Sequence, residues 1–239
     1  MHGDGGWAKS ARGYINFMDR GDPNRELLLD PVMLELCGAA DGVTVLDVGC
    51  GEGRFCRRLA QQGTLVLGID PTHELIHEAR RRGVGEGPYV IGRGESLPFA
   101  SSAFDLVLSY VTLVDIVDYA GAIREMARVL KPGGSLVVAN LGFVTASLGW
   151  ARDEEGKRLY HRVDRYAEEW SQVYQWSDME IVNWHRPLSA YMSTYLSCGL
   201  ILREFLEPVP EDDSLRHHPD FEDWFRVPLF TVMKWEKPD

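Results

Sequence analysis

The residues of this chain best suited to chemistry form a short glycine-rich segment, VTVLDVGCGEGRF (residues 43–55). Three glycines stand there at alternate positions, Gly49, Gly51 and Gly53, shortly after the acid Asp47. A glycine within a helix or strand costs about 1 kcal/mol relative to alanine, so three glycines at the joint of a strand and a helix are unfavourable unless something approaches the backbone. The segment therefore predicts a ligand in contact with bare main chain.

The surrounding residues predict the elements that position this joint. From residue 43 to residue 140, short aliphatic or β-branched runs alternate with helical segments, a pattern typical of βαβ units and a parallel sheet. Right-handed crossovers would place helices on both faces of a doubly wound sheet, with the glycines at the carboxyl ends of its strands. The predicted strands are Thr44–Asp47, Leu65–Asp70, Tyr89–Gly92, Phe104–Ser109 and Ser135–Leu141, and the predicted helices are Gly53–Gln62, Thr72–Arg82 and Ala120–Leu130.

A second acid follows the glycines. Asp70 ends the second predicted strand about 20 residues further on, a position from which a carboxylate accepts hydrogen bonds from both hydroxyls of a ribose. A dinucleotide-binding fold is the competing interpretation, but its fingerprint spaces the glycines G-x-G-x-x-G, whereas here they are spaced G-x-G-x-G. The glycines and Asp70 together predict a site for an adenosine-bearing molecule.

Several segments taken together resemble one known family. VLDVGCGEGRF, GIDPT, ESLPF, FDLVLS and ARVLKPGGSLVV follow one another between residues 43 and 140, and as a set they resemble class I S-adenosylmethionine-dependent methyltransferases. The branch they resemble contains the ubiquinone and menaquinone biosynthesis methyltransferases. The resemblance implies an α/β, Rossmann-like fold with a seven-stranded sheet, mostly parallel with an antiparallel last strand, and S-adenosyl-L-methionine bound across the carboxyl ends. Composition and periodicity support only the α/β sheet and a ligand at that edge.

The same resemblance implies which residues hold the cofactor. Asp70 would bind the ribose, and Tyr14 and Arg25 would lie near the methionine carboxylate. The other implied contacts are Asp47, Gly49, Cys50 and Gly51 at the methionine part, Pro71 and Thr72 along the adenosine, Glu95 and Ser96 beside the adenine, and Ser109 and Tyr110 after the fourth strand.

One position departs from the family pattern. Arg93 stands where relatives of this branch often have an acid that accepts the adenine amino proton, and a guanidinium offers no acceptor. Either Glu95 or a main-chain carbonyl replaces that acid, or adenine is held by apolar contact.

The chain also predicts parts outside the cofactor core. We expect an N-terminal helical lid (residues 1–40), an S-adenosylmethionine-binding core (residues 41–141), an inserted substrate cap (residues 142–187) and the remainder of the core sheet (residues 188–239), which holds a helix and two antiparallel strands. The insertion breaks the strand–helix rhythm and is too long for a simple loop, which favours a cap over a site.

The cap contains the candidate residues for the acceptor and for catalysis, in the segment IVNWHRPLSAY (residues 181–191). His185 is the predicted base, because the unperturbed pKa of histidine lies near neutrality. The alternative is a histidine that fixes the cap by bonding to backbone. Arg186 suits a carboxylate or a lid-fixing ion pair. Trp176, Trp184 and Tyr191 would contact an apolar acceptor or form a small core under the cap.

The amino-acid composition limits the classes of partner that this chain can bind. A formal charge of −11 argues against an electrostatic contact with nucleic acid or an anionic membrane. The sequence lacks the features of a signal or transit peptide and any stretch of about 20 apolar residues, so a cytoplasmic protein is expected. Four cysteines without paired metal spacing predict free thiols, and no metal site is expected.

Residues and resemblance together predict a methyltransferase acting on a small, aromatic or apolar acceptor, with oxygen slightly favoured over nitrogen or carbon. Displacement at a sulfonium needs alignment, exclusion of water and, where the acceptor carries a proton, a base. The alternatives are methylation of a protein or a carrier-bound acyl group, a module that binds the cofactor without turnover, and a nicotinamide-dependent dehydrogenase. The oligomeric state stays open.

Overall fold

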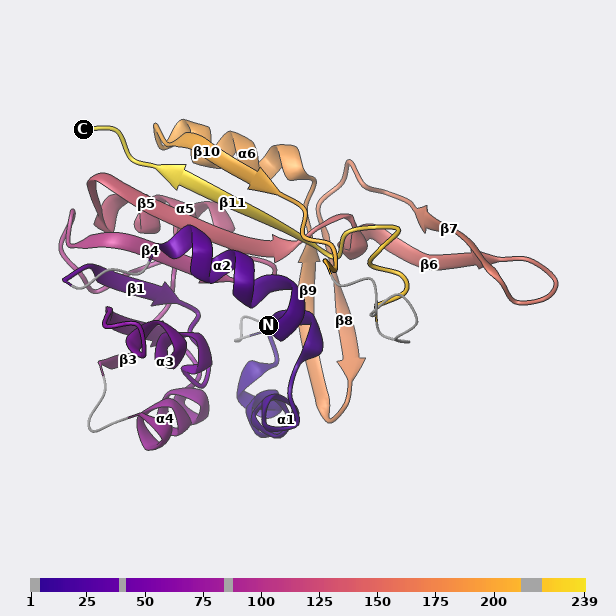
Figure 1. Ribbon diagram of the computed structural model, residues 1–239, viewed down its shortest axis with the longest axis horizontal. Helices are drawn as coiled ribbons and strands as arrows, with labels where there is room; N and C mark the ends of the chain where they lie inside the picture. Colours follow the sequence, from indigo (N-terminus) through magenta and orange to yellow (C-terminus); the bar gives the residue numbers. More distant parts are fainter. Residues whose placement is uncertain (1–4, 39–41, 84–87, 212–220) are drawn as a thin grey trace.

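A seven-stranded sheet forms the centre of the computed structural model, which describes residues 5–38, 42–83, 88–211 and 221–239 (Figure 1). Its strands lie in the order β10-β11-β5-β4-β1-β2-β3, and all neighbours are parallel except where β11 pairs with β5 and β10. The predicted sheet, mostly parallel with an antiparallel last strand, is confirmed. The strands are β1 (Thr44–Val48), β2 (Leu65–Asp70), β3 (Tyr89–Ile91), β4 (Phe104–Tyr110), β5 (Leu130–Leu141), β10 (Ile201–Leu206) and β11 (Phe230–Glu236).

The strand order determines where a ligand can bind. The chain places β2 and β3 on one side of β1 and then β4 and β5 on the other, so the order reverses between β1 and β4. Doubly wound sheets bind their ligands at the carboxyl ends of the strands at such a reversal. The glycine-rich segment follows β1 directly and therefore lies at this point.

Helices cover both faces of the sheet, as predicted, and β1 shows why. Val45 packs in a core with α2, α3 and α4, whereas Leu46 packs in a second core with α5 and α6. Successive side chains of a strand point to opposite faces, so a strand covered on both faces is apolar along its length. The helices are α1 (Trp7–Asp19), the π-helix η1 (Asn24–Leu29), α2 (Asp30–Cys37), α3 (Arg54–Ala60), α4 (His73–Arg82), α5 (Tyr119–Val129), the 3-10 helix η2 (Phe143–Ala146) and α6 (Leu188–Ser197).

The inserted segment consists of two separate hairpins rather than one compact cap. The first, β6 (Ser147–Arg152) with β7 (Arg158–Val163), extends away from the sheet, and the second, β8 (Trp170–Trp176) with β9 (Met179–His185), lies beside α1 (Figure 1). The Ser10 hydroxyl of α1 donates to the carbonyl of Glu180 in β9 at 2.9 Å. The second hairpin is therefore built against the N-terminal helix.

Strand β5 begins earlier than the sequence predicts. The segment KPGG was expected to form a tight turn before a strand at Ser135, but Leu130 already pairs with Phe104, and a register shift follows. The Lys131 ammonium lies 2.8 Å from the Asp105 carboxylate, and the Gly133 amide donates to the carbonyl of Lys237. Because of these bonds, the segment forms an irregular beginning of β5 rather than a tight turn.

Candidate functional site

A crevice opens at the carboxyl ends of β1, β2 and β4. The glycine loop after β1 and the segment after β2 form its floor, and the segments after β3 and β4 form one wall. Residues of α1 and η1 form the opposite wall, so the N-terminal helices lie over the crevice as the predicted lid would.

Two glycines give the loop its path. Gly49 and Gly51 have φ angles of 79° and 56°, in the left-handed region that other residues rarely adopt. A Cβ at Gly49 would overlap the Thr112 side chain, and a Cβ at Gly51 would lie 3.5 Å from the Tyr14 ring. Both positions line the crevice with bare backbone, as the sequence predicts.

Asp70 joins the two loops of the floor. One carboxylate oxygen accepts from the Gly51 amide at 3.1 Å, and the other accepts from the Thr72 amide at 2.8 Å. The side chain lines the crevice although the residue is only 8% exposed, and burial raises its pKa while the two amides oppose that rise. A carboxylate oxygen has a second lone pair, so both oxygens can accept a further hydrogen bond from a bound ligand.

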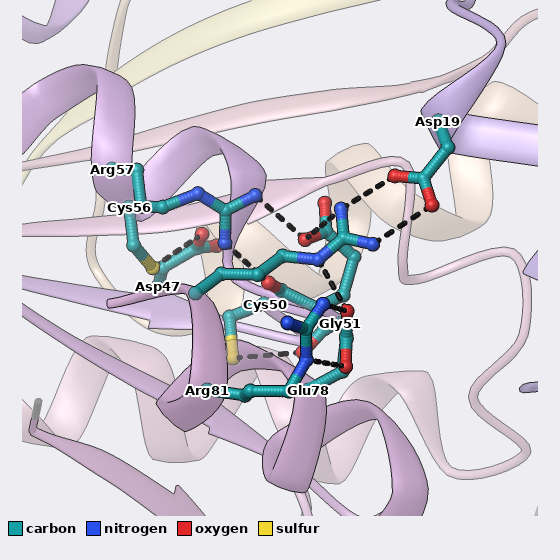
Figure 2. Close-up of polar contacts among 10 residues, drawn as sticks. Asp19, Asp47, Cys50, Gly51, Cys56, Arg57, Glu78 and Arg81 are labelled. Atoms are coloured by element: carbon teal, nitrogen blue, oxygen red, sulfur yellow. Dashed lines mark hydrogen bonds and ion pairs between the residues drawn. The ribbon is translucent and has the colours of Figure 1, made fainter. Parts of the chain in front are cut away.

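Asp47 lies in a small cavity that adjoins the crevice. Its Oδ2 accepts from the Cys56 thiol at 3.2 Å (Figure 2), and its buried Oδ1 has no partner among the described residues. Burial raises the pKa of Asp47 to about 6. An orphaned acceptor in a cavity fits an ammonium group, because an added cation would remove the cost of a desolvated carboxylate.

Arg25 and Tyr14 of the N-terminal wall line both the crevice and this small cavity. The Arg25 guanidinium pairs with Asp22 at 3.1 Å and lies 5.1 Å from the centroid of the Tyr110 ring. The Tyr14 ring packs edge-on against Trp7. A fixed cation beside the cavity that holds Asp47 suits a ligand bearing both an ammonium and a carboxylate.

A chain of ion pairs ties the lid to the core. The Asp19 carboxylate at the end of α1 pairs with Arg82 of α4 at 2.8 Å, and Arg82 also contacts Glu78 and Glu52. Glu52 in turn pairs with Arg57 of α3 at 2.6 Å. Asp19 is half-exposed, so this network positions the lid more than it stabilises the fold.

A second cavity of about 400 Å³ lies next to the crevice. Its walls are mainly aromatic and aliphatic side chains of α1, the hairpin β8–β9 and the segments after β4, after β5 and before β11, together with polar residues that include Asp22, Asn24 and Asp115. We call it the acceptor chamber. Trp7, Arg25, Val111 and Asp115 line both the crevice and the chamber. The two spaces thus share a wall.

Asp115 is the acid in that shared wall. Its carboxylate accepts from the Asn183 amide at 2.5 Å and from the Trp7 indole. Asp115 is partly buried between the two cavities, and desolvation of its carboxylate raises its pKa to about 8. Nearby Val111 has a φ of 57°, an unfavourable backbone conformation of the kind that concentrates at functional sites.

The part of the chain that forms the floor of the crevice is similar to known proteins. Residues 46–138 match the family model Methyltransf_11, described as a methyltransferase domain. Over these residues the chain is similar to methyltransferase domains. The match begins within β1 and ends within β5, so it includes the glycine loop, Asp70 and Asp115.

Curated relatives align with part of the chain. A demethylmenaquinone methyltransferase of Corynebacterium efficiens is 33% identical over 60% of this chain and 61% of its own length. A ubiquinone biosynthesis O-methyltransferase of Methylocella silvestris is 33% identical over 46% of this chain and 44% of its own. An uncharacterised protein of Mycobacterium tuberculosis is 34% identical over 46% of this chain and 41% of its own. The chain thus spans between 41% and 61% of the length of these relatives.

Solved structures match over most of the chain. An S-adenosylmethionine-dependent methyltransferase from Mesorhizobium loti is 25% identical, with a TM-score of 0.79 over 91% of this chain and 99% of the other. A protein from Listeria monocytogenes, described as a candidate member of the same class, is 28% identical, with a TM-score of 0.75 over 87% of this chain and 96% of the other. The predicted fold and the predicted resemblance to S-adenosylmethionine-dependent methyltransferases are confirmed.

Most of the residues that the resemblance assigned to the cofactor lie at the crevice. Those after β1 and β2 are Gly49, Gly51, Asp70, Pro71 and Thr72, and those from other segments are Tyr14, Arg25, Glu95 and Tyr110. Asp47 and Cys50 line the adjoining small cavity.

Two assigned residues of the methyltransferase domain lie outside these spaces. Ser109 is fully buried in β4, where its hydroxyl has no partner among the described residues, and Ser96 is exposed, with its amide bonded to the Arg93 carbonyl. The expected cofactor contacts of these two serines are therefore corrected. Glu95 lines the crevice and pairs with Arg93 at 3.1 Å.

His185 is not placed as a base for an acceptor. The residue is 1% exposed and lines neither the crevice nor the acceptor chamber. Its Nε2 lies 2.9 Å from the Tyr166 carbonyl, which can only accept, so Nε2 carries the proton and Nδ1 accepts from the Thr145 hydroxyl at 2.7 Å. The structure thus corrects the predicted catalytic role to the alternative, a histidine that fixes the base of the hairpin.

Substitution His185→Gln should therefore lower stability and leave cofactor affinity unchanged. Gln cannot reproduce both ring contacts, so the free energy of unfolding should fall by about 1–3 kcal/mol, as for a buried polar group left unpaired. Thermal denaturation and calorimetry measure the two quantities. The control is His161→Gln in the outlying hairpin, whose ring bonds to Ser147. A loss of affinity for S-adenosylmethionine larger than about threefold would contradict this placement.

Arg186 fixes the segment after β4 rather than binding an acceptor. Its guanidinium donates to the carbonyls of Leu113 at 3.0 Å and of Ile116 at 2.6 Å, and its side chain is 1% exposed. It also stacks on Trp184 and Tyr119. The expected acceptor contact of Arg186 is corrected on these grounds.

The structure places one of the three predicted aromatic residues at the acceptor chamber and the other two outside it. Trp176 lines the acceptor chamber and packs edge-on against Phe17 of α1. Trp184 packs on Arg186, and Tyr191 is buried beside Tyr119 in the core of α5 and α6. Trp184 and Tyr191 thus serve the packing that was the alternative interpretation.

Sequence reasoning missed Asp115, Asn183 and Trp7. The sequence did contain a signal for Asp115, because an acid five residues beyond Tyr110 falls in the ligand-binding segment after a central strand. No neighbouring residue, however, distinguishes Asp115 from Asp118 as the functional acid.

Within the described residues, no group of three or more His, Cys, Asp or Glu could hold a metal, and no helix could cross a membrane. His217 and His218 lie outside the described residues.

Proposed function

We propose that this chain is an S-adenosylmethionine-dependent methyltransferase for a small, largely apolar acceptor, with oxygen favoured over nitrogen or carbon. The observation that supports it is the shared wall of two spaces. A crevice of bare glycine backbone, with Asp70 at the end of β2 in its floor, opens beside a largely apolar chamber. This arrangement suits a nucleoside cofactor in one space and a small molecule in the other.

The residues present fit S-adenosylmethionine, which supplies an activated methyl group on a sulfonium when it is bound. Asp70 offers both carboxylate oxygens to the ribose hydroxyls, and the orphaned oxygen of Asp47 suits the ammonium. Arg25 suits the carboxylate of the methionine part. These residues bind and orient, which is the main contribution required for an in-line displacement.

Adenine must be held without the acid that relatives often have at position 93. Glu95 lines the crevice and keeps a free oxygen beside its pairing with Arg93, so we assign it the adenine amino group. Glu95 then takes the role of the acid that relatives often have at position 93, two residues earlier.

The chamber supports a small acceptor over a protein or a carrier-bound acyl group. Its volume of about 400 Å³ falls within the range of ligand pockets. Its walls from α1 and the hairpin β8–β9 exclude water from the shared wall, as methyl transfer requires. Two of the relatives are named as methyltransferases of menaquinone and ubiquinone synthesis, which is consistent with a ring that packs against Phe17 or Trp176 in the chamber wall.

Calorimetry with S-adenosylmethionine, S-adenosylhomocysteine and NAD tests the proposal. We expect the first two to bind and NAD not to bind, because the crevice follows the G-x-G-x-G loop rather than the dinucleotide fingerprint. A screen of phenols, quinols and amines for release of S-adenosylhomocysteine then tests turnover. Binding without any turnover would favour the module that holds the cofactor only, and binding of NAD alone would overturn the proposal.

A further inference from the structure

We propose that Asp115 contacts the reacting group of the acceptor and takes its proton, so that the acceptor is an apolar molecule with a hydroxyl or N–H at the methylated atom. This inference rests on the proposed function. It assigns the base role that the sequence suggested for His185 to a residue on another element.

The position of Asp115 carries the inference. Among the described residues that line both the crevice and the acceptor chamber, Asp115 is the one acid, the others being Trp7, Arg25 and Val111. A molecule in the chamber that faces the crevice must pass this carboxylate. The other polar residues of the chamber wall, Asp22, Asn24, Thr145 and Asn183, do not line the crevice, so an O–H or N–H at the methylated atom of the acceptor is best satisfied at Asp115.

The carboxylate is held in place from three sides. Asn183 of β9 and Trp7 of α1 donate to it. The residue before it, Val114, accepts from the amide of Trp184 at 2.8 Å, and the residue after it, Ile116, accepts from Arg186. Lid, hairpin and strand end thus converge on one side chain, which provides the preorganisation that general base catalysis needs.

The charges around Asp115 determine when it can act. Burial is the main cause that raises its pKa to about 8, and Asp70 acts in the same direction, whereas Asn183, Trp7 and Arg25 oppose the rise. Near neutral pH the carboxyl is therefore mostly protonated in the ligand-free protein. A cation placed in the crevice lowers the pKa and converts the group to the carboxylate that accepts a proton.

The proposed step is balanced in atoms and charge. The acceptor oxygen or nitrogen forms a bond to the methyl carbon, the carbon–sulfur bond breaks, and its electron pair stays on sulfur as a neutral thioether. The proton of the acceptor passes to the Asp115 carboxylate. One positive and one negative charge are lost together, which favours the step in a site removed from water.

Proton release on binding tests the inference without an identified acceptor. S-adenosylmethionine carries a positive sulfur and S-adenosylhomocysteine does not, while both share the amino-acid and adenosine parts. Calorimetry at pH 7 in two buffers of different ionisation enthalpy should show up to about one more proton released with the sulfonium than with the thioether. Protonation changes at Asp47 cancel in this difference, because both ligands contact it through the same group.

Variants make the assignment specific. In Asp115→Asn the difference between the two ligands should vanish, whereas Asp118→Asn, an exposed acid three residues away, should retain it. Asn183→Ala removes a donor that favours the carboxylate and should move the release to higher pH. An equal release with both ligands in the unaltered protein, or a difference that persists in Asp115→Asn, would overturn the inference. Failure of both ligands to bind would instead overturn the proposed function.

A second measurement covers the case in which the variant binds poorly. An acid with a raised folded-state pKa contributes stability that is complete below its unfolded pKa and is lost as pH rises through the folded pKa. The free energy of unfolding of the unaltered protein should therefore fall relative to Asp115→Asn as the pH rises from about 4 to about 8, and the difference should level off above that range. Phenol should also bind the S-adenosylhomocysteine complex about tenfold more tightly than toluene, and this preference should disappear in Asp115→Leu. Parallel stability curves and equal binding of the two probes would refute the role.

Discussion

Substitution Asp70→Asn is expected to lower the affinity for S-adenosylmethionine by about a hundredfold or more. The native carboxylate accepts from the amides of Gly51 and Thr72 and from the Thr72 side chain, and it retains acceptor capacity for the ribose. In the amide, one of these oxygens becomes an NH₂ group, which opposes the Gly51 N–H and cannot accept from a hydroxyl. A charge-assisted hydrogen bond contributes about 1.5–3 kcal/mol, so the loss of one such bond and the displaced loop together account for the expected factor.

Calorimetry with S-adenosylmethionine and with S-adenosylhomocysteine measures this loss, and both ligands should be affected equally because they share the ribose. Glu74→Gln, an exposed acid in the first turn of α4, is the matched control and should leave both affinities unchanged. The variant should remain folded, since removal of a desolvated charge offsets the lost amide contact. Affinities within a factor of about three of the unaltered protein would show that the ribose lies elsewhere.

The core of this site was predictable because its signals are local. The spacing of Gly49 and Gly51, the acid Asp70 at a strand end and the apolar strands between them each depend on a few neighbouring residues. Backbone conformation forces the glycines, and burial on both faces forces the apolar strands. Their order along the chain then fixes the parallel sheet and its reversal point.

The residues of the acceptor chamber were not predictable in the same way. Asp115 gains its environment from Trp7, more than one hundred residues earlier, and from Asn183, 68 residues later. His185 looked reactive because free histidine titrates near neutrality, but packing of β9 gives both its nitrogens protein partners. Contacts at such sequence distance follow from how the hairpin docks on α1, and periodicity contains no information about docking.

The hairpins themselves illustrate the same limit. Residues 142–187 read as one cap because they interrupt the βα rhythm and are rich in aromatic residues. The structure divides these residues into η2 and two pairs of strands, and the chamber lining includes residues of η2 and β8–β9 but none of β6–β7. Strand pairing depends on register with a partner, which alternation within one segment does not specify.

Substitution Asp30→Leu is expected to produce the largest loss of stability in the described part of the chain. Asp30 is fully buried, and its carboxylate accepts from Arg54 at 2.7 and 2.8 Å, from Arg58 at 2.5 Å and from the Tyr110 hydroxyl at 2.7 Å. It therefore joins α2, α3 and the end of β4 beneath the crevice. Leucine fills a similar volume but leaves the Arg54 guanidinium and the Tyr110 hydroxyl without their acceptor.

Removal of one partner from a buried ion pair costs about 3–5 kcal/mol, because the remaining charge stays desolvated. Arg54 keeps 19% of its side chain exposed, so we expect the lower end of that range, about 3 kcal/mol, measured by urea unfolding. Arg58→Met should cost less than about 1 kcal/mol, since that side chain is 40% exposed and Arg54 still satisfies the carboxylate. The triple variant Asp30→Leu, Arg54→Met, Tyr110→Phe should recover part of the loss, because no polar group of the cluster remains unpaired in the core. If the single variant were as stable as the triple variant, the cost would come from cavity or strain at Asp30, and the cluster would not be what fixes Tyr110 against the crevice.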